Sequence, residues 1–344
     1  MYKYAPHRIA RILLLLGMLS LFLTACSPLS HQEKAALEWK QGVFLRLQNN
    51  LSEPITARIQ KMPPDILKII QDEDRSIGIE NTDQYVARKG TAEELALINS
   101  YIDLLPVSYQ TIFSKKILAI YLVDGFAGAG MTNWLVDQDG HTYYYVVFNT
   151  AIMKASIDDW LTYKENSIFD SSAEFPSIRI RTNTNYKAIM YGLLHECAHI
   201  VDYELGIAPY FEPLHRKYKK RTQETSAFTD GVWLQRSQPE PRYDFKHRGD
   251  MNIYGEFAKK GLIPRSELSG MFSQLTQTPF VTFYSGTSWN EDLADYMTYH
   301  YLERGLGGDV RSELVREEKI INHYDPIKTS QAKKREKSIG IFYE

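Results

Sequence analysis

The fold is decided by a stretch that runs from residue 184 to residue 206 and reads TNYKAIMYGLLHECAHIVDYELG. Apolar residues recur in it at helical spacing, so we expect one long amphipathic helix with a face on the core. Thr184 or Asn185 can cap its start, Gly206 can end it, and Pro209 follows. The expected apolar stripe consists of Met190, Leu193, Leu194, Cys197, Ile200, Val201 and Leu205.

His195, Glu196 and His199 form an H-E-x-x-H pattern within this helix. Residues four apart share a helix face, so both imidazoles can bind one tetrahedral metal ion. Glu196 adjoins the first histidine, where a carboxylate can take a proton from a metal-activated water. We therefore predict that His195 and His199 bind one Zn²⁺ per chain and that Glu196 is the catalytic base. The alternative is that both histidines are ordinary polar surface residues.

A catalytic zinc site needs a third protein ligand and an open position for water. The extended metzincin pattern fails here, because Leu205 stands where its third histidine would be. Asp202 lies one turn past His199, but three ligands on one straight helix would strain a tetrahedral site.

Glu291 is the preferred third ligand, because it lies on a separate predicted helix over residues 290–306. The alternative is a capping box that starts at Ser288, in which Glu291 only caps its own helix.

The segment Asn290-Glu-Asp-Leu-Ala-Asp295 resembles the N-E-x-x-x-D helix of the gluzincins. In that group the glutamate completes the metal site, and the acid four residues on orients a ligand histidine. The resemblance implies that Glu291 is the ligand and that Asp295 is the orienting residue behind it.

A closer resemblance joins both segments. His195-Glu196-x-x-His199-x-Val201-Asp202 is similar to the metal-binding helix of the anthrax lethal factor-like metallopeptidases. That family has a tyrosine seven residues before the glutamate ligand and an acid four after it, and here Tyr284 and Asp295 stand at those places around Glu291.

The resemblance covers roughly residues 110 to 325 in order of elements. It implies a zincin-like fold, hydrolysis of peptide bonds, and Tyr284 as a hydrogen-bond donor to the developing oxyanion. Asp202 is assigned with Asp295 to the shell behind the ligands. The alternative for Tyr284 is that it is one more of 23 tyrosines.

The first 25 residues are predicted to be a signal peptide. Lys3, Arg8 and Arg11 precede an apolar run over residues 12–23, which is too short to span a bilayer comfortably. Leu23-Thr-Ala-Cys26 resembles a bacterial lipobox, which implies a lipidated Cys26, a membrane anchor and a place in the bacterial cell envelope. Ser27 favours the outer membrane, and the alternative is a plain signal peptide with an incidental cysteine.

Composition limits the classes of partner. Apolar residues make up 44% of the chain, enough for a substantial core, and the net charge of -2 leaves no electrostatic footprint for nucleic acid. The only other cysteine is Cys197, so acylation of Cys26 would exclude an intramolecular disulfide.

The predicted fold class is α+β and zincin-like: a small twisted sheet, the H-E-x-x-H helix, and a mostly helical C-terminal lobe. A capping box at Thr91 predicts a helix over residues 91–105, and residues 125–130 form a glycine-rich loop that lines a groove. Strand 143–148 is expected to align an extended peptide by strand addition. Further helices are expected at 31–51, 55–71 and 310–322, and further strands at 117–123, 134–136 and 177–181.

These elements divide the chain into a signal peptide (1–25), a helical N-terminal region (26–110), a zincin-like metallopeptidase domain (111–325) and a basic tail (326–344) with a solvated face. The predicted function is zinc-dependent hydrolysis of a peptide or protein substrate by a membrane-anchored enzyme. Two alternatives stay open: a binding or scaffold lipoprotein with a non-catalytic zinc site, and a zinc hydrolase of a non-protein substrate. The intact Glu196 argues against the first, because a structural site has no need for a carboxylate there.

Overall fold

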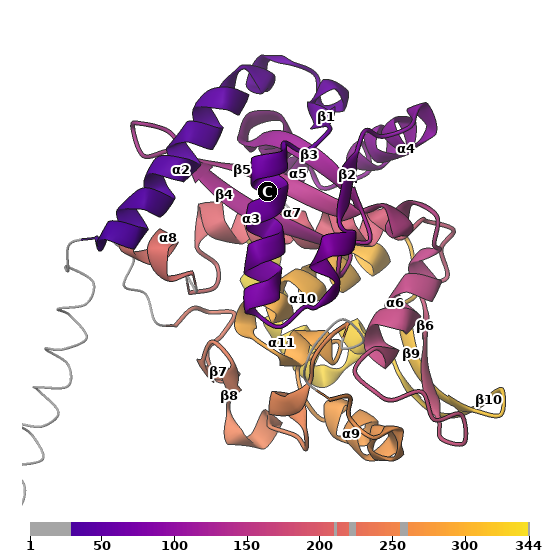
Figure 1. The fold of residues 1–344 in the computed structure, drawn as a ribbon. Coiled ribbons are helices and arrows are strands. Elements are labelled where there is room, and N and C mark those ends of the chain that lie inside the picture. Colours follow the sequence, from indigo (N-terminus) through magenta and orange to yellow (C-terminus); the bar gives the residue numbers. More distant parts are fainter. Residues whose placement is uncertain (1–28, 210–211, 220–224, 255–260, 343–344) are drawn as a thin grey trace, which may run out of the picture.

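A computed structural model describes residues 29–209, 212–219, 225–254 and 261–342, which form a mixed α+β fold (Figure 1). Cys26 and the expected signal peptide lie outside the described residues. Among the helices of the described part, none has the length and apolarity to cross a membrane.

The central sheet is small and mixed. Strand β3 (Ile117–Asp124) runs parallel to β5 (Thr142–Asn149), and β5 pairs antiparallel with β4 (Gly130–Val136) at the edge. On its other side β3 pairs with the short strands β1 (Ile59–Gln60) and β2 (Val86–Arg88). The strands predicted at 117–123, 134–136 and 143–148 are confirmed. The prediction that 143–148 offers a free edge is wrong, because β5 is paired on both sides and β4 is the edge strand.

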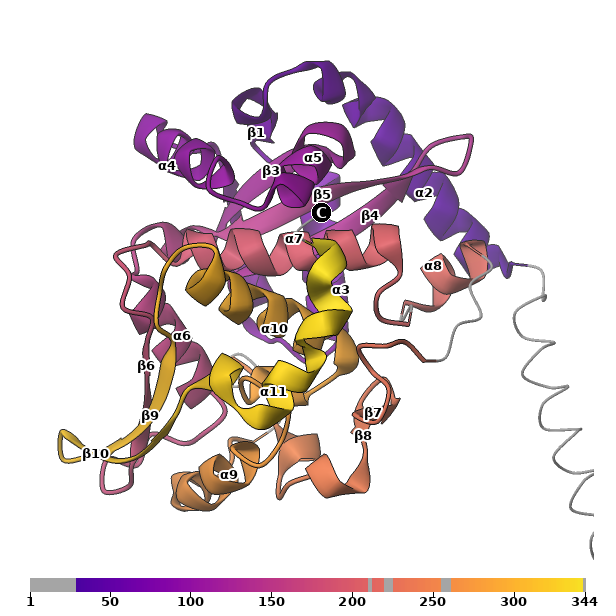
Figure 2. The same ribbon diagram turned by 180° about the vertical axis from the view of Figure 1, so that it is seen from behind.

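Helices cover both faces of this sheet. Alternate residues of β3 and β5 point to opposite sides, so each strand feeds two apolar clusters. One face packs against α4 (Ala92–Ile102), α5 (Val107–Lys116) and α7 (Ile189–Leu205). The other face packs against α2 (His31–Leu47) and α3 (Pro64–Ser76). Figure 1 is seen from the side of α3, and Figure 2, turned by 180°, is seen from the side of α7. Residues 29–110 thus add two strands to the same sheet and helices to both of its faces.

A second sheet has the order β10-β9-β6, with β6 (Ser177–Arg181) as predicted. The helix predicted over 310–322 is wrong: β9 (Arg311–Arg316) and β10 (Lys319–Tyr324) form a hairpin. Its turn places Glu317 and Glu318 at φ 48° and 60°. That backbone conformation is typical of Asn-Gly or Asp-Gly, so two glutamates gave no turn signal in the sequence.

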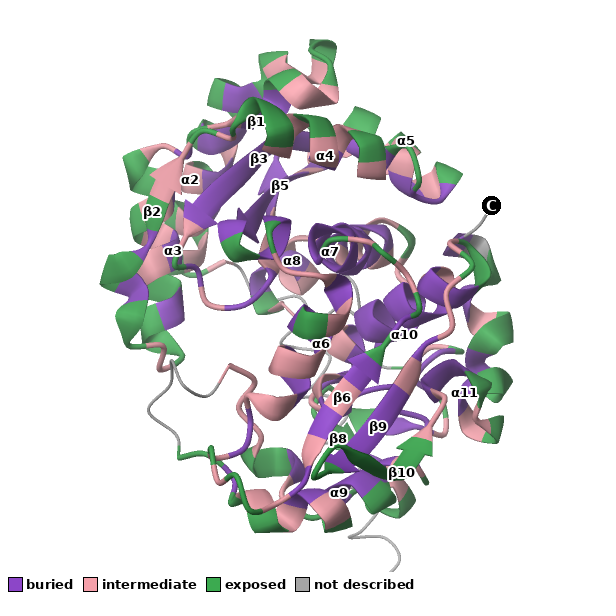
Figure 3. Ribbon diagram, turned by 90° about the vertical axis from the view of Figure 1, so that its right-hand side faces the viewer, coloured by how far each residue is buried: buried purple, intermediate pink, exposed green. Residues whose placement is uncertain are grey.

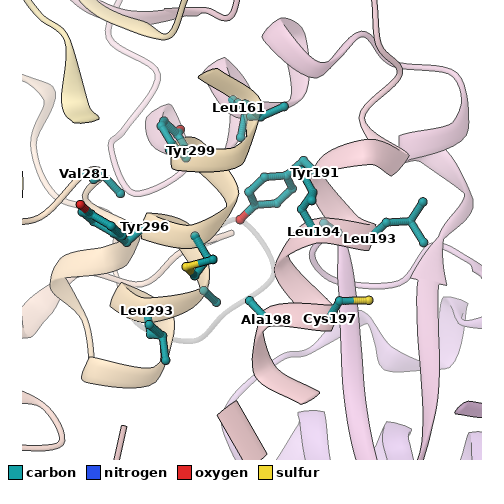
Figure 4. Close-up of a cluster of buried hydrophobic side chains, with 14 of the residues drawn as sticks. Leu161, Tyr191, Leu193, Leu194, Cys197, Ala198, Val281, Leu293, Tyr296 and Tyr299 are labelled. Carbon is teal, nitrogen blue, oxygen red and sulfur yellow. The ribbon is translucent and has the colours of Figure 1, made fainter. Parts of the chain in front are cut away.

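Most of the remaining elements lie on the side of α7 that faces away from the central sheet. Helix α10 (Trp289–Arg304) packs along α7, and Figure 4 shows Tyr191 and Ala198 of α7 facing the helix that carries Leu293 and Tyr299. Figure 3 shows that α7 is buried along most of its length. The other helices and strands here are α6 (Ile157–Asn166), α8 (Pro213–Tyr218), α9 (Leu268–Leu275), α11 (Ser330–Arg335), β7 (Trp233–Gln235) and β8 (Gln238–Pro239).

The segment expected to be a solvated basic tail is packed on the body. Arg335 of α11 is buried and forms an ion pair of 2.6 Å with Asp292 of α10. Phe342 is buried too and lies edge-on to Tyr109 of α5. The expectation of a solvated face is therefore wrong for these residues.

Candidate metal centre

Helix α7 carries the H-E-x-x-H residues into the space between the central sheet and α10. The helix begins at Ile189 with Ala188 at its N-cap, so the predicted caps Thr184 and Asn185 are wrong. Gly206 ends it as predicted, in a left-handed conformation with φ 67°. The close packing of α7 against β4 requires a glycine at position 130. A Cβ on Gly130 would lie 2.8 Å from Val147 O and 3.2 Å from Glu196 Cγ.

Three donor atoms from α7 and α10 converge on one point. His195 Nε2 lies 3.2 Å from His199 Nε2 and 3.1 Å from Glu291 Oε2, and His199 Nε2 lies 3.5 Å from the same oxygen. Ligand bonds of about 2.0–2.2 Å in a tetrahedral zinc site put donor atoms about 3.3–3.6 Å apart. His195, His199 and Glu291 are thus a possible metal-binding group.

Glu291 does not cap its own helix. Ser288 is the N-cap of α10, but its side chain makes no capping hydrogen bond and instead donates to Asn290 Oδ1. Asn290 Nδ2 donates to Glu291 Oε1 at 2.8 Å, which leaves Oε2 facing the imidazoles. Burial opposes ionisation of Glu291, but His199 and His195 hold the pKa of its carboxyl well below its usual range.

Asp295 lies behind His195, one helical turn after Glu291. Its Oδ1 accepts hydrogen bonds from His195 Nδ1 at 3.0 Å and from the Tyr191 hydroxyl at 2.9 Å. Its Oδ2 accepts from Lys164 Nζ at 2.7 Å and from the Thr282 hydroxyl at 2.5 Å. Burial alone would lower the pKa of His195, but Asp295 and Glu291 outweigh it and raise this pKa to about 10.

Glu196 turns its carboxylate toward the edge strand. The Thr132 hydroxyl of β4 donates to Glu196 Oε2 at 2.8 Å. Burial raises the pKa of Glu196, and the two neighbouring imidazoles counteract part of this rise. A carboxylate held in this way beside two imidazoles is placed to accept a proton from a water molecule in the cleft.

Tyr284 lies against the same group, on a short 3-10 helix (Tyr284–Gly286) before α10. Its ring stacks on His195 with centroids 5.7 Å apart, and its hydroxyl lies near the Glu291 carboxylate. Burial, followed by the nearby Glu291, raises the pKa of this phenol well above its usual value. The hydroxyl therefore remains protonated and able to donate at neutral pH.

Asp202 binds the backbone after α7, and its charge interacts with His199. Its Oδ1 accepts the Ala208 backbone N–H at 2.6 Å, so the side chain stabilises the turn that follows α7. Burial raises the pKa of Asp202 to about 7. Asp295 thus lies behind His195, while a supporting role of Asp202 behind His199 stays a prediction.

A cleft of about 280 Å³ opens at the donor group. The loop between β3 and β4 lines one side, as predicted, and Asp74, Ile77 and Ile79 from the N-terminal region line another. Asn149 Nδ2 holds this loop by donating to the carbonyls of Phe126 and Gly128. The donor atoms thus face a space that a ligand can enter.

Sequence reasoning missed Lys164, Thr132, Tyr191 and Thr282. Lys164 had a detectable signal, because it stands within the apolar stripe of α6 after Ile157, Trp160 and Leu161. Comparison of the chain with family models, with curated proteins and with solved structures finds no match.

Proposed function

We propose that the chain is a zinc-dependent peptidase with a zincin-like fold, of the gluzincin type and related to the lethal factor-like metallopeptidases that its motifs resemble. The convergence of His195, His199 and Glu291 at the cleft carries this proposal. A structural zinc site is closed by four protein ligands, whereas a catalytic one uses three and leaves a position open. Within the described residues, three side chains form this group.

The chemistry follows from the residues around that group. When bound, zinc lowers the pKa of a water molecule toward neutrality and polarises a carbonyl. Glu196 accepts the proton of the attacking water and then delivers it to the leaving amine nitrogen. Thr132 holds the Glu196 carboxylate through its 2.8 Å hydrogen bond. Tyr284 donates its hydroxyl proton in a hydrogen bond to the carbonyl oxygen as negative charge develops there.

A peptide substrate is favoured over a non-protein one by the edge strand. Gly130, Met131 and Thr132 of β4 line the cleft, and in the described part of the chain β4 pairs only with β5. Its outer edge near the cleft can add an extended peptide by backbone hydrogen bonds.

The test measures zinc content and cleavage of a general peptide library by the purified chain, with Glu196→Gln as the matched control. Zinc at one per chain with cleavage that the control lacks supports the peptidase. Zinc without cleavage of any peptide supports a binding or scaffold protein or a hydrolase of another substrate. Absence of zinc binding contradicts the proposal as a whole.

We further propose that a lipid on Cys26 anchors the enzyme in the bacterial cell envelope, at the outer membrane. Leu23-Thr-Ala-Cys26 supports this, with Ser27 after it. In Cys26→Ser the chain should stay unprocessed or leave the membrane fraction, as measured by fractionation and N-terminal mass. Unchanged processing and fractionation would exclude the lipid anchor.

A further inference from the structure

A buried lysine lies directly behind the metal centre, on a helix that supplies none of the three donor atoms. Lys164 belongs to α6, and its side chain is 0% exposed. An ammonium group is costly to bury unless it is paired and hydrogen-bonded. The groups that contact the Lys164 ammonium therefore indicate the role of this side chain.

Asp295 is the closest of these partners. Lys164 Nζ lies 2.7 Å from Asp295 Oδ2, 3.1 Å from the Tyr191 hydroxyl and 3.6 Å from Glu165 Oε1. Asp295 in turn binds His195 Nδ1 at 3.0 Å through its other oxygen. A continuous chain of contacts thus runs from Lys164 through one carboxylate to the back of a predicted metal ligand.

The same ammonium also touches the predicted oxyanion donor. Lys164 Nζ lies 4.9 Å from the ring centroid of Tyr284, within the range of a cation–π contact. The Tyr284 ring is stacked on the His195 imidazole. Lys164 therefore acts on His195 through Asp295, and it also contacts the ring that stacks on His195.

We propose that Lys164 is a positioning residue of the metal centre. Its ammonium compensates the buried charge of Asp295 and fixes the direction of that carboxylate, which orients His195 with Nε2 toward Glu291 and His199. Its contact with the Tyr284 ring holds the phenol beside the donor group. This inference rests on the metal-binding part of the proposed function and does not require that the substrate is a peptide.

The test is the Kd for Zn²⁺ of the full mature chain, measured by competition with a chromophoric chelator. Lys164→Met keeps the length of the side chain without its charge. Loss of an outer partner of a metal ligand typically costs about 10–100-fold in affinity, so we expect the Kd to rise at least about tenfold.

Lys40→Met is the matched control. Lys40 of α2 is also buried, 9% exposed, and donates to Asn133 Oδ1 and to the Trp134 carbonyl. Its ammonium also lies over an aromatic ring, 4.2 Å from the centroid of Trp134. Removal of this lysine also takes a buried ammonium out of the fold but should leave the zinc Kd within about twofold, because its ammonium donates to Asn133 and Trp134 of β4 and to none of the metal-binding residues.

A second comparison covers the case in which Lys164→Met does not fold. Lys164→Met/Asp295→Asn removes both charges of the pair, which a protein interior tolerates better than one stranded charge. If Lys164 acts through Asp295, the double variant should bind zinc as weakly as Asp295→Asn, within about twofold. A further tenfold loss in the double variant, or a folded Lys164→Met with wild-type Kd, overturns the inference.

The outcomes separate this inference from the proposed function. A wild-type chain that binds zinc and cleaves no peptide contradicts the peptidase, while the effect of Lys164→Met on the Kd still decides the role of the lysine. An active wild-type chain whose zinc Kd is unchanged by Lys164→Met contradicts the positioning role alone.

Discussion

Glu291→Gln is the change that most directly tests whether two helices form one metal site. Glutamine keeps the shape of the side chain but removes the only carboxylate of the group, whose Oε2 lies 3.1 Å and 3.5 Å from the two imidazole nitrogens. Loss of an outer partner alone typically costs about 10–100-fold in affinity, so loss of a ligand should cost at least about a hundredfold.

The loss of zinc affinity can be measured as a smaller thermal stabilisation of the folded chain by zinc. Free zinc at a hundred times the wild-type Kd stabilises the folded chain by about 2.7 kcal/mol, and a hundredfold weaker site leaves only about 0.4 kcal/mol. At roughly 2 °C per kcal/mol for a chain of this size, the zinc-induced rise in Tm should fall from about 5 °C to under 1 °C. Scanning calorimetry in a zinc buffer measures this directly.

The matched control is Asp202→Asn, since Asp202 is a buried carboxylate on α7 that binds the backbone of Ala208. This variant should lose stability with and without zinc and yet keep the full zinc-induced rise in Tm. A full rise in Glu291→Gln, or its loss in Asp202→Asn, would refute the assignment of the third ligand.

Three further variants test the catalytic assignments, with zinc content measured alongside kcat on a cleaved library peptide. Glu196→Gln should keep zinc and lose about a hundredfold or more in kcat, because the proton acceptor is gone; full activity would contradict its role as the base. Tyr284→Phe should lower kcat by roughly a hundredfold, the scale of one lost oxyanion donor, and a change within about twofold would disprove that role. Thr132→Val removes a charge-assisted hydrogen bond worth about 1.5–3 kcal/mol and should lower kcat about tenfold or more with zinc unchanged; unaltered kcat would mean that the Glu196 carboxylate is held by other contacts.

Much of the fold was predictable because its main elements carry local signals. Short apolar runs on either side of the turn dipeptide Asp139-Gly140 marked β4 and β5, the capping box at Thr91 marked α4, and Gly206 marked the end of α7. The hairpin β9–β10 was not predictable, because its turn uses Glu317 and Glu318 in place of the usual turn residues.

The convergence of the three candidate metal ligands was predictable for a similar reason. His195, His199 and Glu291 lie in two short segments whose internal spacing is fixed by a helix. The residues around them were not, because their contacts join distant elements: Lys164 reaches Asp295 across 131 positions, and Thr132 reaches Glu196 across 64. No local pattern encodes such a pairing, although a lysine within the apolar stripe of α6 indicates that a buried counter-charge must exist.

The early start of α2 leaves only a short stretch of chain between Cys26 and the folded body. Its first residue is His31, with the N-cap Ser30 only four positions after Cys26. Four residues span at most about 14 Å, less than the radius of gyration of about 20 Å expected for a body of this size. If Cys26 carries the lipid, the N-terminal end of α2 must stay at the bilayer surface and the molecule has little freedom to tumble. The cleft then stays close to the bilayer, so proteins of the same membrane, or chains that pass close to it, are within its reach.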